Sequence, residues 1–176
     1  MTPILLKSIA AITAVAGLAV NSSDGLGTGD AYELSPLTQL TQSDIKTHAM
    51  HVFMRGDANG DNVLDADEYT SLSVITAELA QLNGFIVIET GDDYLTAQLP
   101  DAGRAALSVS EQIRIEAVSR KEFYLFAGED GKMNVSEFAE AQISKFNQAD
   151  FNGNGVLARR ELYSFAARQA LVAHEV

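Results

Sequence analysis

Oxygen-bearing side chains at alternate positions mark the segment 57–68 as a candidate metal-binding loop. They stand at positions 1, 3, 5, 9 and 12 of the segment and are Asp57, Asn59, Asp61, Asp65 and Glu68. Calcium takes about six to eight oxygen ligands at about 2.3–2.6 Å, and alternate residues of a tight loop point inward to supply them. Val63 at position 7 would add its backbone carbonyl, and Leu64 at position 8 is apolar. The spacing therefore predicts a calcium site.

A second segment, 150–161, repeats the pattern with fewer charges. Its side-chain candidates at positions 1, 3, 5 and 12 are Asp150, Asn152, Asn154 and Glu161, with the carbonyl of Val156 at position 7. Only two of these side chains are carboxylates, against four in the first segment, and Ala158 has no oxygen at position 9. Arg159 and Arg160 add positive charge beside the ion. Because affinity follows ligand charge, we expect the second site to be weaker.

A third segment, 126–137, carries only the second half of the pattern. Asp130, Asn134 and Glu137 stand at positions 5, 9 and 12, whereas Phe126 and Gly128 replace the first two ligands. Too few oxygen ligands remain for a hard cation. We expect this segment to have a structural role.

All three segments resemble loops of the EF-hand calcium-binding superfamily, and the 24-residue step between the starts of the last two is similar to the spacing in exported bacterial EF-hand proteins. The resemblance implies helix–loop–helix units, Ca²⁺ as the bound cofactor and a non-enzymatic role. One departure is Asn62 at position 6, where the family uses glycine for a sharp turn. Asparagine tolerates a positive φ better than most residues, so this departure is expected to weaken the site rather than abolish it.

The elements that would position these loops are helices. Apolar periodicity and capping signals predict helices over about 43–53, 67–82, 108–126, 135–149 and 159–173. Ser108 and Glu111 form a capping-box signature at the start of the third. The fold class predicted is all-α, with a small hairpin over 85–96 inside an insert at 84–107 and a short β contact between paired loops.

Loop spacing predicts which loops pair. EF-hand loops usually pair through position 8, here Leu64, Met133 or Leu157. A shared helix of about 15 residues is about 22 Å long and would separate the loops 126–137 and 150–161. We therefore expect the loop 57–68 to pair with 126–137. The loop 150–161 would then be unpaired, or would pair with a second copy of the chain in a homodimer.

The first twenty residues have the features of a secretory signal peptide. Lys7 precedes an uncharged run from Ser8 to Val20, which suits an h-region better than a membrane span. The domain organisation predicted is a signal peptide at 1–20, a flexible linker at 21–40 and an EF-hand domain at 41–176. The expected location is the periplasm or the medium, without stable membrane insertion after cleavage.

Composition narrows the function classes. The chain has 24 acidic and 12 basic residues, and its net charge of −12 disfavours nucleic-acid binding. Ten of the acidic residues but only three of the basic ones lie in the three loops. Without cysteines there are no disulfides or thiolate metal sites, and no catalytic constellation is evident. His48 and His51 could share Zn²⁺ with a carboxylate, but no third ligand is evident in the sequence.

The sequence supports two hypotheses about the function. The first is an exported, non-enzymatic protein that binds calcium as a buffer, as a sensor or for its own stability. The second is an acidic interaction module of the cell envelope, in which the EF-hands are mainly structural and the protein partner is unknown.

Overall fold

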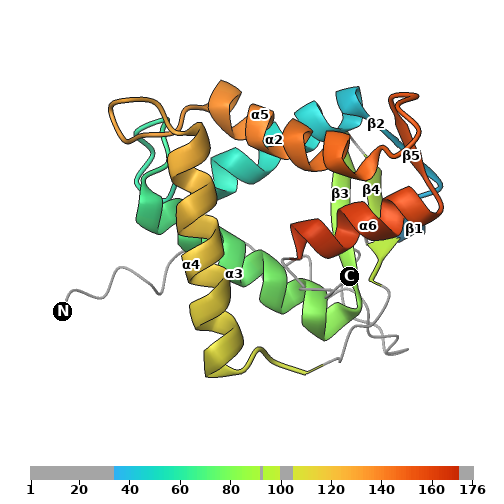
Figure 1. Ribbon diagram of the computed structural model, residues 1–176, viewed down its shortest axis with the longest axis horizontal. Coiled ribbons are helices and arrows are strands. Elements are labelled where there is room, and N and C mark those ends of the chain that lie inside the picture. Colours follow the sequence, from blue (N-terminus) through green and yellow to red (C-terminus); the bar gives the residue numbers. More distant parts are fainter. Residues whose placement is uncertain (1–33, 92, 100–104, 171–176) are drawn as a thin grey trace, which may run out of the picture.

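The computed structural model describes residues 34–91, 93–99 and 105–170, which form five helices and five short strands. The elements follow one another as β1 (Leu34–Pro36), β2 (Gln39–Thr41), α2 (Gln42–Gly56), α3 (Ala66–Asn83), β3 (Phe85–Thr90), β4 (Asp93–Gln98), α4 (Val109–Phe126), α5 (Val135–Ala149), β5 (Val156–Ala158) and α6 (Arg160–Gln169). Figure 1 shows α2 and α5 crossing above α3 and α4, with the strands and α6 at the other end.

The predicted all-α class is wrong, because the strands form two small sheets and the fold is mixed α/β. In the three-stranded sheet, β4 lies between β3, antiparallel to it, and β1, parallel to it. The predicted hairpin is confirmed as β3 and β4, which pair from Phe85 opposite Gln98 to Thr90 opposite Asp93. The β-branched residues that follow α3 favour the strand β3. The local sequence contains no comparable signal for β1 and β2 or for the strands with which they pair.

Capping residues set the helix boundaries. Thr41 and Asp44 form a capping box at the start of α2, and Ser108 and Glu111 form the predicted one at the start of α4. Asn134 caps α5 in the same way, with Glu137 as its partner. Such boxes satisfy amide groups that have no partner inside the helix, so each helix begins at a defined residue.

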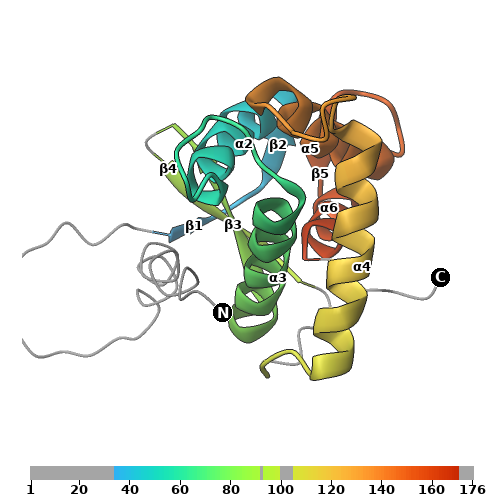
Figure 2. The ribbon, with the colours of Figure 1, turned by 90° about the vertical axis from the view of Figure 1, so that its left-hand side faces the viewer.

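The predicted pairing of the loops 57–68 and 126–137 is confirmed. Leu64 and Met133 form an antiparallel bridge with two hydrogen bonds, of 2.8 Å from the Leu64 amide and 2.9 Å from the Met133 amide. Figure 1 shows these loops side by side at one end of α5, and Figure 2 shows α3 and α4 running alongside each other below them. The 15-residue helix α5 separates this pair from the loop 150–161, as expected.

The loop 150–161 is not unpaired, which corrects the prediction. Its strand β5 pairs with β2 in antiparallel register, with Leu157 opposite Leu40 and Val156 opposite Thr41. The position-8 contact is therefore made within the chain, by a strand that belongs to no helix–loop–helix unit. The premise of the predicted homodimer, a loop without a β partner, does not hold.

Two buried clusters lie beneath the two ends of the molecule. The cluster under the paired loops contains Leu64 and Met133 and four aromatic residues, which are Phe53, Tyr69, Phe123 and Phe138. Tyr69 packs against Phe123 in a tilted arrangement and against Phe138 edge-on, at centroid distances of 5.8 and 6.0 Å. The second cluster joins the hairpin and β2 to α6, and it contains Leu40, Ile88, Leu157 and Phe165.

The N-terminal predictions fall partly outside the described residues. The predicted signal peptide at 1–20 and linker residues 21–33 lie there, whereas β1 and most of β2 occupy the end of the predicted linker. The predicted helix over 159–173 is observed as α6, and residues 171–176 are outside the described part. Within the described ranges, none of the helices has the length and apolar character of a membrane span.

Candidate metal centre

Helix ends place the first and last candidate ligands of the loop 57–68. Asp57 is the C-cap of α2, where its amide donates to the carbonyl of Phe53 at 2.9 Å. Asp65 is the N-cap of α3, and Glu68 stands in the first turn of that helix. Because Phe53 and Tyr69 are anchored in the core, the two ends of the loop are held by packed helices.

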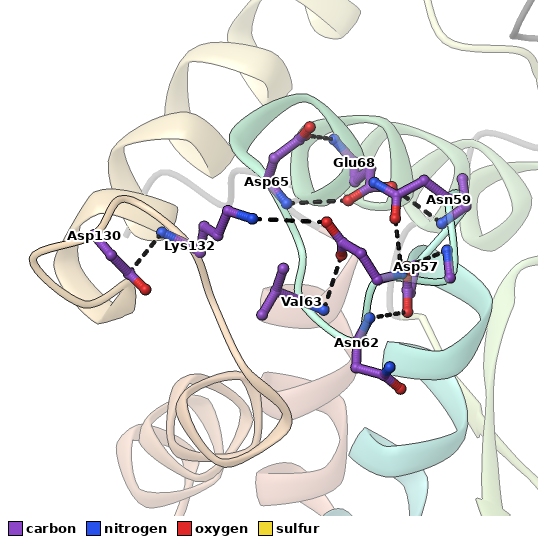
Figure 3. Close-up of polar contacts among 11 residues, drawn as sticks. Asp57, Asn59, Asn62, Val63, Asp65, Glu68, Asp130 and Lys132 are labelled. Atoms are coloured by element: carbon purple, nitrogen blue, oxygen red, sulfur yellow. Dashed lines mark hydrogen bonds and ion pairs between the residues drawn. The ribbon is translucent and has the colours of Figure 1, made fainter.

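Asp57 organises the first half of this loop. Its Oδ1 accepts the amide hydrogens of Gly60 at 2.8 Å and Asp61 at 3.2 Å, and its Oδ2 accepts that of Asn62 at 2.9 Å. These bonds curl the backbone around the carboxylate, as Figure 3 shows. The turn requires a φ of 75° at Gly60 and 63° at Asn62. Asn62 therefore adopts the left-handed conformation that the family pattern assigns to glycine, as expected of an asparagine.

The candidate oxygens of the remaining residues also accept hydrogen bonds from backbone amides of the loop. Asn59 Oδ1 accepts from the amide of Asp61 at 2.8 Å, and Asp61 Oδ1 accepts from the amide of Val63 at 3.1 Å. Glu68 closes the loop, because its Oε1 accepts from the amide of Ala58 at 3.1 Å and its Oε2 from that of Asp65 at 3.0 Å. One glutamate thus links the start of the loop to its end.

The loop 150–161 repeats this hydrogen bonding position for position. Asp150 caps α5 and accepts the amides of Gly153 at 2.9 Å, Asn154 at 3.2 Å and Gly155 at 2.8 Å. The Oδ1 atoms at positions 3 and 5 accept from Asn154 at 3.0 Å and from Val156 at 2.8 Å. Two segments with different residues at positions 2, 5 and 6 have therefore folded alike.

The second loop differs at its closing end. The side-chain amide of Asn152 donates to Glu161 Oε1 at 2.7 Å, whereas in the first loop the backbone amide of Ala58 donates to Glu68 Oε1. Position 9 is Ala158, and Arg159, the N-cap of α6, makes no side-chain cap bond. This end lacks the capping box that Asp65 and Glu68 provide in the first loop, consistent with fewer oxygen ligands there.

Measured from the helix C-cap to the closing glutamate, the loop 126–137 is one residue shorter than the other two. The capping residue of the preceding helix here is Ala127, so eleven residues reach Glu137, against twelve from Asp57 to Glu68 and from Asp150 to Glu161. Ala127 has no side-chain oxygen to curl the backbone. The amide of Gly128 instead donates to the carbonyl of Lys132 at 3.1 Å, and only the capping end, Asn134 with Glu137, matches the first loop.

Two basic residues reach toward the acidic groups of the loop 57–68, and the sequence reasoning missed both contacts. Lys132 Nζ lies 3.7 Å from Asp61 Oδ2, and Arg120 donates to Asp67 Oδ1 at 2.6 Å. In Figure 3 the side chain of Lys132 extends from its own loop toward the first loop. The predicted Leu64–Met133 pairing was a usable signal for Lys132, because it places the residue before Met133 beside the first loop.

The two histidines considered for zinc meet a carboxylate that the sequence did not indicate. Glu89 on β3 faces α2: its amide donates to His48 Nδ1 at 3.2 Å, and its Oε2 lies 3.2 Å from His51 Nδ1. Arg55 forms an ion pair with the other oxygen of Glu89. Burial alone would raise the pKa of Glu89, but the hydrogen bond and charge of Arg55 outweigh it and lower that pKa. The guanidinium already balances the carboxylate, so this cluster is best described as a structural ion pair.

The donor set of the loop 57–68 fits a hard cation. Each of its five candidate side chains carries oxygen, four of the five are carboxylates, and those of Asp57, Asn59 and Asp61 accept hydrogen bonds from loop amides. In the part of the chain that the structure describes, no three His, Cys, Asp or Glu side chains gather into one compact group. The four carboxylates of the candidate ligand set are therefore not gathered around one point in this structure.

The chain matches no protein-family model, no curated protein and no solved structure. The resemblance of the loops to EF-hand loops therefore rests on the residues and geometry described above.

Proposed function

We propose that this chain is a non-enzymatic EF-hand protein that binds calcium ions, with one stronger and one weaker site. The observation that carries the proposal is the shared hydrogen bonding of the loops 57–68 and 150–161, in which the aspartate at position 1 accepts the amides of positions 4, 5 and 6 in both. Two loops that share this ligand spacing and the same hydrogen bonding support a common ligand.

In the stronger site, the ion would be held by Asp57, Asn59, Asp61, Asp65, Glu68 and the carbonyl of Val63. Bound calcium would supply positive charge that offsets four carboxylates crowded into one loop. In the weaker site, Asp150, Asn152, Asn154, Glu161 and the carbonyl of Val156 would do the same with two carboxylates. The loop 126–137 lacks a first ligand and, measured from the helix C-cap, is one residue short, which supports a structural role for it.

Calorimetric titration of residues 21–176 with Ca²⁺ tests this proposal. We expect two unequal sites, with the stronger one lost in Asp57→Asn plus Glu68→Gln and the weaker one lost in Asp150→Asn plus Glu161→Gln. Asp130→Asn plus Glu137→Gln is the matched control in the third loop and should retain both sites. No heat at millimolar calcium in the unmodified protein would refute the proposal.

Export is a separate part of the proposal and needs its own measurement. The predicted signal peptide at 1–20 places the mature protein in the periplasm or the medium. Cell fractionation with N-terminal sequencing of the recovered protein should find a processed chain outside the cytoplasm. An intact Met1 in the cytoplasmic fraction would contradict this part alone.

The interaction module remains a second candidate because α4 exposes apolar side chains. Val109 at the start of this helix and Tyr124 and Leu125 near its end are 72%, 62% and 71% exposed. If partner binding is primary and the ion is structural, a partner captured from envelope extracts should still bind Asp57→Ala plus Glu68→Ala. Capture that depends on calcium and on these residues would favour a sensor.

A further inference from the structure

The side chain of Lys132 provides a positive charge at one of the candidate ligands of the loop 57–68. Its Nζ lies 3.7 Å from Asp61 Oδ2, while the other oxygen of that carboxylate accepts the amide of Val63 at 3.1 Å. Asp61 occupies position 5 of the loop. Because of these two contacts, both of its carboxylate oxygens already have partners in the absence of an ion. About half of each side chain is exposed, 52% for Lys132 and 44% for Asp61, which leaves the ammonium free to swing away.

The backbone beneath Lys132 is fixed relative to the first loop. Its neighbour Met133 is fully buried and is joined to Leu64 by two backbone hydrogen bonds. The amide of Lys132 donates to Asp130 Oδ1 at 3.1 Å, and its carbonyl accepts from Gly128 at 3.1 Å. The side chain can therefore move, but its attachment point stays beside the candidate site.

We propose that Lys132 acts as an internal cation that competes with calcium for Asp61, so that the degenerate loop 126–137 sets the affinity of the loop 57–68. This inference rests on the proposed function. When an ion binds Asp61, the lysine loses its partner and its charge is repelled by the divalent ion. Both effects weaken binding, and together they correspond to roughly three- to tenfold in affinity for an exposed pair.

The effect should be confined to the first loop. The residue at position 5 of the second loop is Asn154, which is uncharged, and its Oδ1 accepts the amide of Val156. The competing charge is also sensitive to salt, because the screening length falls from about 8 Å at physiological ionic strength to about 3 Å at 1 M. The effect of Lys132 on the calcium affinity should therefore be smaller at high salt.

The test is a calcium titration of residues 21–176 carrying Asp150→Asn plus Glu161→Gln, so that only the first loop reports. Lys132→Met in this background should raise the affinity roughly three- to tenfold at low salt and much less at 1 M salt. Lys46→Met removes the same charge from an exposed position of α2 that is eleven residues from Asp57, about 16 Å along the helix, and should leave the affinity unchanged.

A second comparison isolates the Lys132–Asp61 pair. With Asp61→Asn already present, Lys132→Met should raise the affinity by less than it does with Asp61 intact, because the paired carboxylate is gone. Circular dichroism of each calcium-free variant checks that it is folded. An unchanged affinity in Lys132→Met, or an equal gain in Lys46→Met, would overturn the inference while leaving calcium binding intact. Loss of binding in the parent protein would instead refute the proposed function.

Discussion

Leu40 and Leu157 lie opposite each other in the β2–β5 pair, and neither side chain is exposed to solvent. A strand that precedes the first helix thus holds the loop of the last helix–loop–helix unit. The loop 150–161 therefore depends on residues more than a hundred positions earlier in the chain.

Replacing Leu40 with alanine should destabilise the protein and weaken the second calcium site without removing a ligand. The substitution leaves a cavity in the cluster that joins β2, β5 and α6, and such losses cost about 2–5 kcal/mol. Chemical denaturation and calcium titration measure the two effects. Leu82→Ala, at a side chain 43% exposed, is the control and should change the free energy of unfolding by less than about 0.5 kcal/mol. A normal second site in a folded Leu40→Ala protein would show that β2 does not support this loop.

Asp57→Ala should destabilise the protein even in the absence of calcium. The carboxylate accepts amides from Gly60, Asp61 and Asn62, and alanine leaves all three without this acceptor. We expect a loss of about 1–3 kcal/mol, measured by urea denaturation in the presence of a chelator. Asp57→Asn keeps one acceptor oxygen and should lose less. Equal stability of Asp57→Ala and the unmodified protein would mean that these bonds do not organise the apo loop.

The two loops should respond differently to substitutions at position 6. Gly155 has a φ of 77° with open space where a Cβ would stand, so Gly155→Ala should cost about 1 kcal/mol through backbone strain alone. Asn62 tolerates a φ of 63°, so Asn62→Gly should change stability by less than about 0.5 kcal/mol. Thermal unfolding of both variants in a chelator gives the comparison. A larger effect at Asn62 than at Gly155 would contradict this account of the turns.

Stability should fall as the pH is lowered from about 6.5 to about 4. Burial lowers the pKa of His48 from its ordinary 6.5 to about 4, so over this interval the unfolded chain takes up a proton that the folded chain refuses. The lowered pKa of Glu89 acts in the same direction at the acidic end, because a carboxylate held in its charged form loses its contribution when protonated.

Melting temperatures at several pH values, with a chelator present, measure this dependence. His48→Gln removes the titrating ring and should flatten the curve between pH 6.5 and 4. A slope that is unchanged in His48→Gln would assign the pH dependence to other groups.

Local signals in the sequence were sufficient for the helices and the two complete loops. The oxygen spacing from Asp57 to Glu68 and from Asp150 to Glu161 located the loops, and Ser108 with Glu111 located the start of α4. Loop spacing alone predicted the Leu64–Met133 pairing, because a helix as long as α5 cannot bring the loops at its two ends together.

Long-range pairing was beyond local signals. Leu34–Pro36 and Gln39–Thr41 lie in or at the edge of a polar segment, and three-residue strands are stabilised by partners that are distant in sequence. The capping box of Thr41 and Asp44 was a signal that the chain is ordered before α2, and it went unused. The contact of Glu89 with His48, His51 and Arg55 depends on the docking of β3 against α2, which periodicity cannot reveal.

Thr41 is both the last residue of β2 and the N-cap of α2, and α2 ends at Gly56 with Asp57 as its C-cap. If the predicted signal peptide is removed, the cleavage must therefore leave both short strands in place. A chain trimmed to begin at residue 21 retains both short strands, whereas trimming to Gln42 removes β1, the β5 partner and the α2 cap together. We expect such over-trimming to damage the distant loop 150–161 first, although it lies at the other end of the sequence.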